Sequence, residues 1–185
     1  AFENVVWQEI ANGYEGFADD AKAAGRKLTV DTTSPMGESD EEGQLSILKD
    51  QVRQGVNAVL LSPISDANCL PGIEAAHDAD IPVFAVNNEF NGADMFVGPN
   101  SLEQGEIAAE WVNDKIGGKG EVAIVMGMAK TGVTRNRTEG FESWFKENNP
   151  DIEVVAKQNA DWDRSKAKDV AATFLKTYPD LKAVF

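Results

Sequence analysis

A regular alternation of extended apolar runs with helical patterns constrains the fold of this chain more than any other feature of its sequence. The run over residues 58–64 and the run over 82–86 are almost continuously apolar, which is typical of strands covered on both faces. Between such runs, apolar residues recur at spacings of three and four, as on one face of a helix. Strands that alternate with helices indicate parallel sheets built from βαβ units. We therefore predict an α/β fold.

The same patterns predict the individual elements. Helices are expected over residues 7–21, 42–54, 70–79, 102–116, 137–148 and 164–177, and strands over 28–30, 58–64, 82–86, 95–97, 121–126, 152–156 and 183–185. Each helix carries an apolar stripe that we expect to face the interior. These stripes include Phe17, Ile107, Trp111 and Leu175.

The pattern restarts after Gly98 and Pro99, which predicts two domains over residues 1–98 and 99–185. No strand precedes the first helix, and the last residues enter an apolar strand where the sequence stops. The first strand of a doubly wound sheet is usually central, and its removal would leave backbone groups unpaired. We therefore expect these 185 residues to be an internal part of a longer protein, without its first strand and its C-terminal part.

Composition excludes several classes of function. The net charge of −14 and the pI of about 4.4 argue against nucleic acid and anionic membranes as partners. Cys69 and His77 are the single cysteine and the single histidine, so no internal disulfide can form. One cysteine and one histidine also provide too few side chains for a zinc site and make a catalytic Cys-His or Ser-His pair improbable. We predict no catalytic residue, no metal and no cofactor.

Two distant tryptophan segments, each beside polar side chains, predict a site for a neutral polyol. Trp7 follows Asn4 at a helix start, and Trp162 lies between two aspartates just before another helix. Asn87 and Asn88 end an apolar strand, and Arg137 lies near a third helix start. Such strand-to-helix connections gather at one edge of an open α/β sheet, where ligands bind.

Each of these residues also has a simpler interpretation. Trp7 fits the apolar stripe of its helix, and Asn4 is a suitable N-cap. The two asparagines fit a turn, and an arginine in so acidic a chain fits a surface ion pair. Trp162 precedes the apolar period of its helix, so core packing explains it poorly.

Six motifs in sequence order resemble the ribose/galactose-type periplasmic sugar-binding proteins of bacterial ABC transporters, which share their fold with the effector domains of LacI-type repressors. They are NVVWQ at 4–8, EGQ at 42–44, AVLLSP at 58–63, IPVFAVNN at 81–88, RNRTEGF at 135–141 and ADWDRSKA at 160–167. The resemblance implies the type 1 periplasmic binding protein fold, in which two doubly wound, Rossmann-like parallel-sheet domains are joined by a hinge and close on a sugar. This chain would hold most of the first domain and the beginning of the second.

The resemblance also implies roles for the site residues. Trp7 and Trp162 would stack on the sugar from opposite domains, and Arg137, rather than Arg135, would donate paired hydrogen bonds to hydroxyls. Asn87 and Asn88 depart from the Asp-Arg or Asp-Asn pair of many family members, which leaves the particular sugar open.

The leading hypothesis is a solute-binding protein that captures a sugar or sugar alcohol by hinge closure and delivers it to a membrane permease. It would be a monomer in the periplasm, or an extracellular lipoprotein in a Gram-positive organism. The alternatives are a LacI-type regulator's effector domain and an enzyme acting on a sugar. Asp161, Asp163 and Glu89 are candidate acids or bases for the enzyme by position alone.

Overall fold

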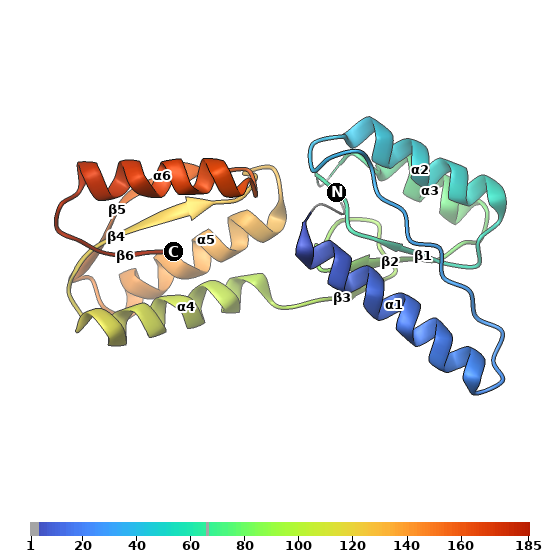
Figure 1. The fold of residues 1–185 in the computed structure, drawn as a ribbon, viewed down its shortest axis with the longest axis horizontal. Coiled ribbons are helices and arrows are strands. Elements are labelled where there is room, and N and C mark those ends of the chain that lie inside the picture. Colours follow the sequence, from blue (N-terminus) through green and yellow to red (C-terminus); the bar gives the residue numbers. More distant parts are fainter. Residues whose placement is uncertain (1–3, 66) are drawn as a thin grey trace.

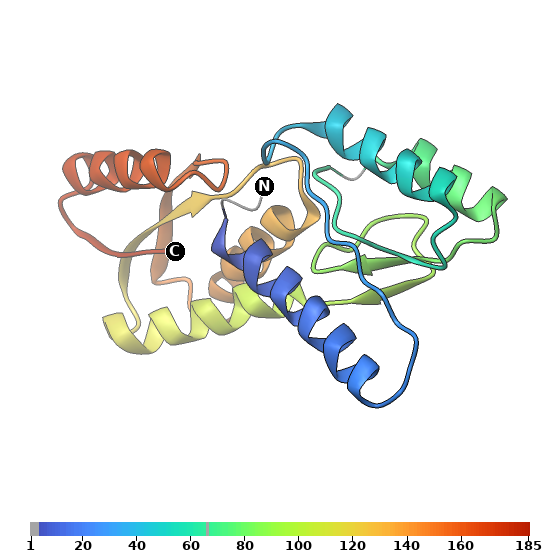
Figure 2. The same ribbon diagram turned by 45° about the vertical axis from the view of Figure 1, so that its right-hand side comes forward.

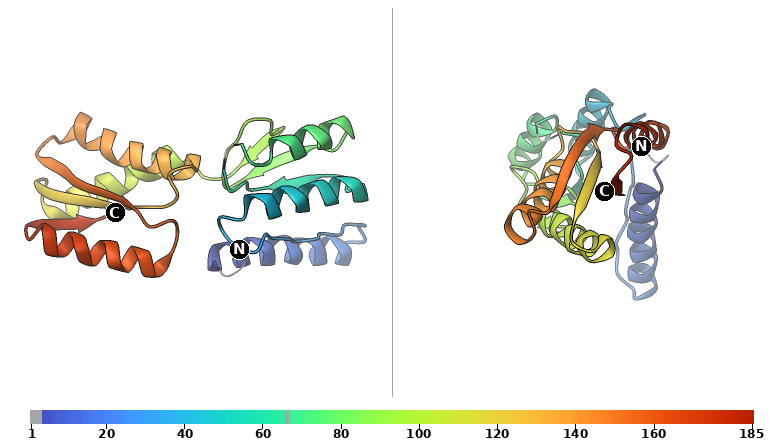
Figure 3. Two further views of the ribbon diagram at one scale, coloured as in Figure 1. Left: turned by 90° about the horizontal axis from the view of Figure 1, so that it is seen from above. Right: turned by 90° about the vertical axis from the view of Figure 1, so that its left-hand side faces the viewer.

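Two lobes, each with its own parallel sheet, make up the chain in a computed structural model that describes residues 4–65 and 67–185 (Figure 1). The first lobe contains α1 to β3, and the second contains α4 to β6. The chain passes from one to the other through residues 98–100, and Figure 3 shows the lobes side by side around this connection. This architecture confirms the predicted α/β class with parallel sheets.

The first lobe has a three-stranded sheet between its helices. Its elements are α1 (Val5–Ala23), α2 (Glu41–Gln54), β1 (Val59–Leu61), α3 (Leu70–Asp78), β2 (Val83–Val86) and β3 (Met95–Val97). The strand order is β1-β2-β3 and both pairings are parallel, with Val59 opposite Val83 and Phe84 opposite Met95. Helices α2 and α3 cover one side of the sheet and α1 lies on the other (Figures 1 and 2). The core joins Leu48 and Ile73 to β1 and β2.

The second lobe repeats this plan. Its elements are α4 (Ser101–Ile116), β4 (Gly120–Met126), α5 (Gly132–Asn148), β5 (Ile152–Asn159), α6 (Arg164–Thr177) and β6 (Leu181–Val184), with parallel strands in the order β5-β4-β6. On one face, α4 and α5 bury Val122 and Ile124 of β4. On the other face, Val170 and Phe174 of α6 pack on Ala123.

Side chains at the helix ends explain where the helices begin and stop. Asn4, Asp40, Asn100, Thr131 and Asp163 accept backbone N–H bonds as N-caps of α1, α2, α4, α5 and α6, which satisfies donors that a helix leaves free. Gly55 and Gly117 end α2 and α4 with φ angles of 72° and 77°. Glycine adopts this left-handed conformation without steric cost.

Three predictions from the sequence are wrong in detail. Residues 28–30 form no strand, because residues 26–35 lack a ladder partner among the described residues. Helix α5 begins at Gly132, five residues before the predicted start, because Thr131 caps it. Apolar side chains on the predicted inward stripes are exposed where no element covers them: Phe17, Ile107, Trp111 and Leu175.

Candidate ligand-binding cavity

A cavity of about 820 Å³ is lined mainly by the first lobe, along α1, the segment 27–35, α2 and β1, and extends to Met128, Thr131, Val133, Arg137 and Trp162 of the second lobe. The strands of each sheet are parallel, and their carboxyl ends lead into loops that line this cavity, namely 62–64 after β1, 87–88 after β2 and the segment around Met128 after β4. This is the edge where ligands bind in open α/β sheets. The lining includes every residue that we singled out as a ligand contact: Asn4, Trp7, Asn87, Asn88, Arg137 and Trp162.

The first-lobe wall begins at the N-terminus of α1. Asn4 caps this helix, since its Oδ1 accepts the N–H of Val6 at 3.0 Å. The same side chain donates through Nδ2 to Oε1 of Glu38 at 3.4 Å, and the indole Nε1 of Trp7 donates to that oxygen at 3.1 Å. Both the capping role of Asn4 and its position at the cavity therefore hold, and Trp7 is half-buried at the cavity rather than enclosed in a core.

Asn87 and Asn88 form the turn after β2. Asn87 has a φ of 61°, a conformation that asparagine tolerates better than most residues. Its Nδ2 donates to Oδ1 of Asn88 at 3.2 Å, and Nδ2 of Asn88 donates to the carbonyl of Pro63 at 3.2 Å. The pair therefore ties the ends of β1 and β2 together at the cavity, so the turn interpretation is compatible with a ligand contact.

Arg137 projects from α5 in the second lobe. Its Nε donates to Oε1 of Gln104 at 2.9 Å, and its terminal nitrogens have no protein partner among residues 4–65 and 67–185. Burial lowers the pKa of this guanidinium from its ordinary value, because desolvation disfavours the charged form. A half-buried fork of donors fixed at one nitrogen is suited to neighbouring hydroxyls. Arg135, by contrast, is exposed and does not line the cavity.

Trp162 stands on the loop between β5 and α6. Asp161 and Trp162 have φ angles of 53° and 62°, which is a strained conformation for a large aromatic residue. The indole lies directly against Gly127, where an added Cβ would come within 2.2 Å of its Cε2 atom. Its side chain remains 43% exposed. The backbone therefore presents a flat apolar ring to the cavity instead of to the core.

The structure adds residues that sequence reasoning missed. Glu38 lines the cavity and accepts from Asn4 and Trp7, and Gln104 fixes Arg137. The Oγ of Ser62 is buried at the cavity and has no partner among the described residues. The sequence could have indicated Ser62, because it is a polar residue at the end of an apolar strand, as Asn87 is. Glu38 and Gln104 carry no comparable signal, because their roles depend on contacts far along the chain.

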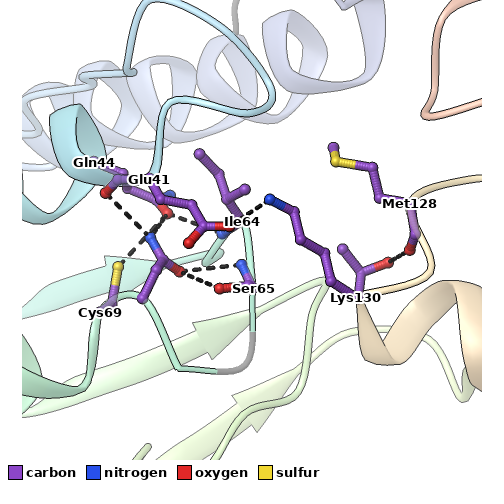
Figure 4. Close-up of polar contacts among 9 residues, drawn as sticks. Glu41, Gln44, Ile64, Ser65, Cys69, Met128 and Lys130 are labelled. Carbon is purple, nitrogen blue, oxygen red and sulfur yellow. Dashed lines mark hydrogen bonds and ion pairs between the residues drawn. The ribbon is translucent and has the colours of Figure 1, made fainter.

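A polar network fixes the loop after β1 (Figure 4). Gln44 donates from Nε2 to the carbonyl of Ser62 at 2.8 Å. Its Oε1 accepts from the N–H of Ile64 (Figure 4) and from Nδ2 of Asn68, each at 2.9 Å. Asn68 in turn accepts the N–H of Ser65 at 3.1 Å. The first-lobe wall beside Ser62 is therefore held from α2.

An ion pair between described residues connects the lobes close to this network. Lys130, on the loop between β4 and α5, reaches Oε1 of Glu41 in the first turn of α2 (Figure 4). The two side chains are 40% and 37% exposed, so solvent screens much of their attraction.

The cysteine and the histidine do not contribute to this cavity. Burial raises the pKa of the Cys69 thiol to about 11, so it stays protonated, and Nε2 of His77 lies 3.2 Å from Asp94, outside the cavity. The described residues contain no group of three or more potential metal ligands, and none of their helices is long and apolar enough to cross a bilayer. A second cavity of about 400 Å³ lies along α5.

Comparison with known proteins places this arrangement in a family. The family model described as periplasmic binding protein domain matches residues 3–185. The chain belongs to the periplasmic binding protein family. This confirms the resemblance read from the sequence motifs, together with the two-domain fold class that it implies.

Curated relatives include the ribose import binding protein RbsB of Bacillus subtilis, which is 30% identical over 92% of this chain and 54% of its own length. The D-allose-binding periplasmic protein of Escherichia coli is 29% identical over 98% of this chain and 60% of its own length. The chain thus spans little more than half the length of these relatives.

Solved structures agree on the fold. A solute binding protein of Agrobacterium vitis with bound D-fucose has a TM-score of 0.88 at 24% identity and covers 98% of this chain and 63% of its own. One from Mycobacterium smegmatis with bound glycerol has a TM-score of 0.78 at 28% identity, covering 90% of this chain and 57% of its own.

Proposed function

We propose that this chain binds a neutral sugar or sugar alcohol in the part of the cavity that both lobes line and serves as the ligand-capturing part of an ABC transporter solute-binding protein. The observation that carries the proposal is the meeting of Trp7, Asn87, Arg137 and Trp162 from two lobes around one cavity. Two aromatic faces suit the C–H patches of a sugar ring, while amide and guanidinium groups suit its hydroxyls. The curated relatives bind ribose and allose.

The mechanism is closure of the two lobes on the ligand. A ligand that contacts both walls binds the closed arrangement better than the open one, and it therefore shifts the population toward closure. The side chains with differential contacts are Asn4, Trp7, Asn87 and Asn88 on the first lobe and Arg137 and Trp162 on the second.

Membership of the family supports a proposal for the partners and the location. We propose delivery to a membrane permease, from the periplasm or from an extracellular lipoprotein in a Gram-positive organism, by a monomer that needs no cofactor and binds no nucleic acid. Curated relatives named as import binding proteins favour transport over a LacI-type regulator. We propose binding without catalysis, and the single histidine lies outside the cavity.

A thermal-shift screen of the full chain against pentoses, hexoses, deoxysugars and sugar alcohols tests the proposal. A ligand that binds only the native state raises the melting temperature, and we expect one chemical group of sugars to do so while quenching tryptophan fluorescence. Trp162→Ala should weaken binding by roughly 30-fold, as for removal of a buried aromatic anchor. Arg137→Ala should weaken it by about tenfold, because it removes charged hydrogen bonds.

Trp111→Ala is the matched control, since this tryptophan is 61% exposed on α4 and lies outside the cavity. It should leave the affinity unchanged. Wild-type affinity in both Trp162→Ala and Arg137→Ala would contradict the proposed site. The absence of any hit across the panel would contradict the ligand class.

A further inference from the structure

Glu38 occupies an unusual place on the first-lobe wall. It lies on the loop before α2, far along the chain from α1, yet one carboxylate oxygen accepts from both Trp7 and Asn4, at 3.1 Å and 3.4 Å. The side chain is half-buried and lines the cavity. The two residues expected to contact the ligand from α1 therefore share a single acceptor.

The loop that carries Glu38 is itself anchored. Asp40 accepts the N–H of Gly43 through Oδ1 at 3.0 Å and the N–H of Met36 through Oδ2 at 3.1 Å. These bonds fix both sides of Glu38 to the start of α2. An indole has a single N–H donor, so an acceptor held in this way sets the orientation of the Trp7 ring.

The Glu38 carboxylate has no cationic partner among the described residues. Arg137 lies on the other lobe and is bonded to Gln104. A carboxylate accepts hydrogen bonds and cannot donate them, so this part of the wall favours hydroxyl or ammonium donors and repels an anionic group.

We propose that Glu38 is a positioning and specificity residue, which orients the Trp7 indole and makes the first-lobe wall select neutral sugars over anionic ones. The inference rests on the proposed function and deepens it. The position of Glu38 in the sequence does not indicate either role. The positioning role can be tested without a ligand, and the specificity role is tested by binding.

The ligand-free test compares near-ultraviolet circular dichroism and fluorescence of Glu38→Ala and Glu38→Gln in wild-type and Trp7→Phe backgrounds. We expect Glu38→Ala to change both spectra, and Glu38→Gln to restore most of the signal because its amide oxygen can still accept. The change should vanish in the Trp7→Phe background, which isolates Trp7 from the other tryptophans. Spectra that change equally in both backgrounds would overturn the positioning role.

The binding test uses two probe pairs in calorimetry, D-ribose with D-ribose 5-phosphate and D-galactose with D-galacturonate. For the pair whose neutral member binds, we expect Glu38→Gln to reduce the preference for that member by roughly three- to tenfold, as for loss of one partly screened like charge. The phosphate is also bulky, but its steric effect is the same for the wild type and the variant, so comparing the two proteins on one probe isolates the effect of charge. An unchanged preference would overturn the specificity role.

Glu9→Gln is the charge control, because Glu9 is an exposed carboxylate on α1 outside the cavity. It should leave the preference and both spectra unchanged. If no neutral probe binds the wild type, the specificity role and the sugar proposal both fail for these probes. The spectra still decide the positioning role on their own, so the two failures are distinguishable. A thermal melt of each variant confirms that it is folded.

Discussion

At the scale of single residues, the strained backbone at Asp161 and Trp162 is the clearest sign of a functional constraint. Two successive non-glycine residues with positive φ are unfavourable, and such strain persists only where the surroundings enforce it. Here the N–H of Ala160 bonds to Met126 at 2.7 Å, and the N–H of Asp163 bonds to Ala160 at 2.8 Å. The strand β4 and the cap of α6 therefore hold the turn that presents the indole.

Gly127→Ala tests how the ring is seated. The new methyl would collide with the indole of Trp162 and lie 2.8 Å from Oγ1 of Thr134. Because the half-exposed ring can swing away, we expect a small loss of stability but a loss of sugar affinity of about tenfold, comparable to removing part of an aromatic contact. Calorimetry with the best sugar of the screen measures it. Gly13→Ala, with open space at its Cβ, should leave the affinity unchanged; equal affinities in the two variants would contradict the seating.

Cys69 provides a prediction about reactivity. Its side chain is buried and its thiol pKa is raised to about 11, and the thiolate is the reactive form. We expect no reaction with a thiol reagent at pH 8 in the folded protein and complete reaction after denaturation, measured by absorbance. Since the folded-state pKa lies above the ordinary thiol value of 9.0, the stabilisation from this group is complete below pH 9 and is lost as the pH rises toward 11. Rapid labelling of the native thiol would contradict the buried assignment.

At the scale of elements, the close approach of α4 and α5 positions Arg137. A Cβ at Gly105 would lie 2.2 Å from the carbonyl oxygen of Arg137, and one at Gly140 would lie 2.1 Å from that of Leu102. The helices therefore pack backbone to backbone at two glycines. Gln104, beside the first glycine, then reaches the guanidinium.

Gly140→Ala should separate these helices. Because the obstacle is backbone rather than a flexible side chain, we expect destabilisation of about 1–3 kcal/mol, as for overpacking, and hence a lower melting temperature by circular dichroism. Gly16→Ala is the control: with open space around it on α1, it should be neutral or stabilise by up to about 1 kcal/mol. A melting temperature unchanged by Gly140→Ala would contradict the tight contact.

Most elements could be predicted from sequence because their local signals are complete. Residues 164–177 carry a cap, an apolar stripe and a clear end, and α6 has those bounds. Residues 28–30 have an apolar pattern, but a strand also needs a hydrogen-bonded neighbour, which the sequence cannot supply. Periodicity likewise identifies an apolar stripe without saying what covers it, which is why Trp111 is 61% exposed.

The residues of the candidate site also divide into those that local sequence patterns predict and those that they do not. Trp162 follows the end of β5 and Arg137 lies near the start of α5, the helix after β4, and the alternation of strands and helices brings such connections together. All six residues that we predicted as ligand contacts line one cavity, whereas the candidate acids Asp161, Asp163 and Glu89 do not. Contact of the six with a ligand stays a prediction. Glu38 could not be predicted from the sequence, because its hydrogen bond to Trp7 spans 31 positions and no local pattern encodes such a contact.

At the scale of the whole molecule, the ion pair of Lys130 with Glu41 joins the lobes. Exposed pairs contribute about 0.2–1 kcal/mol, so we expect Lys130→Gln to weaken sugar binding by no more than about sixfold at low salt, with the difference shrinking at high salt. Exchanging the charges, Lys130→Glu with Glu41→Lys, should recover most of the loss. Calorimetry at two ionic strengths measures both effects.

Lys157→Gln is the matched control, because Lys157 pairs with Glu142 inside the second lobe at 3.0 Å. It should change neither the affinity nor its dependence on salt. A loss of binding in Lys130→Gln that is independent of salt would contradict an electrostatic connection between the lobes.

Both walls of the cavity are held in place by contacts inside their own lobe. Arg137 projects from a helix packed backbone to backbone on its neighbour, and Trp7 is oriented by a loop residue whose loop is anchored to α2. A wall that is ordered before the ligand arrives lowers the entropy lost on binding. We therefore expect substitutions that loosen either wall to leave the rate of capture nearly unchanged and to shorten the time for which the captured sugar stays.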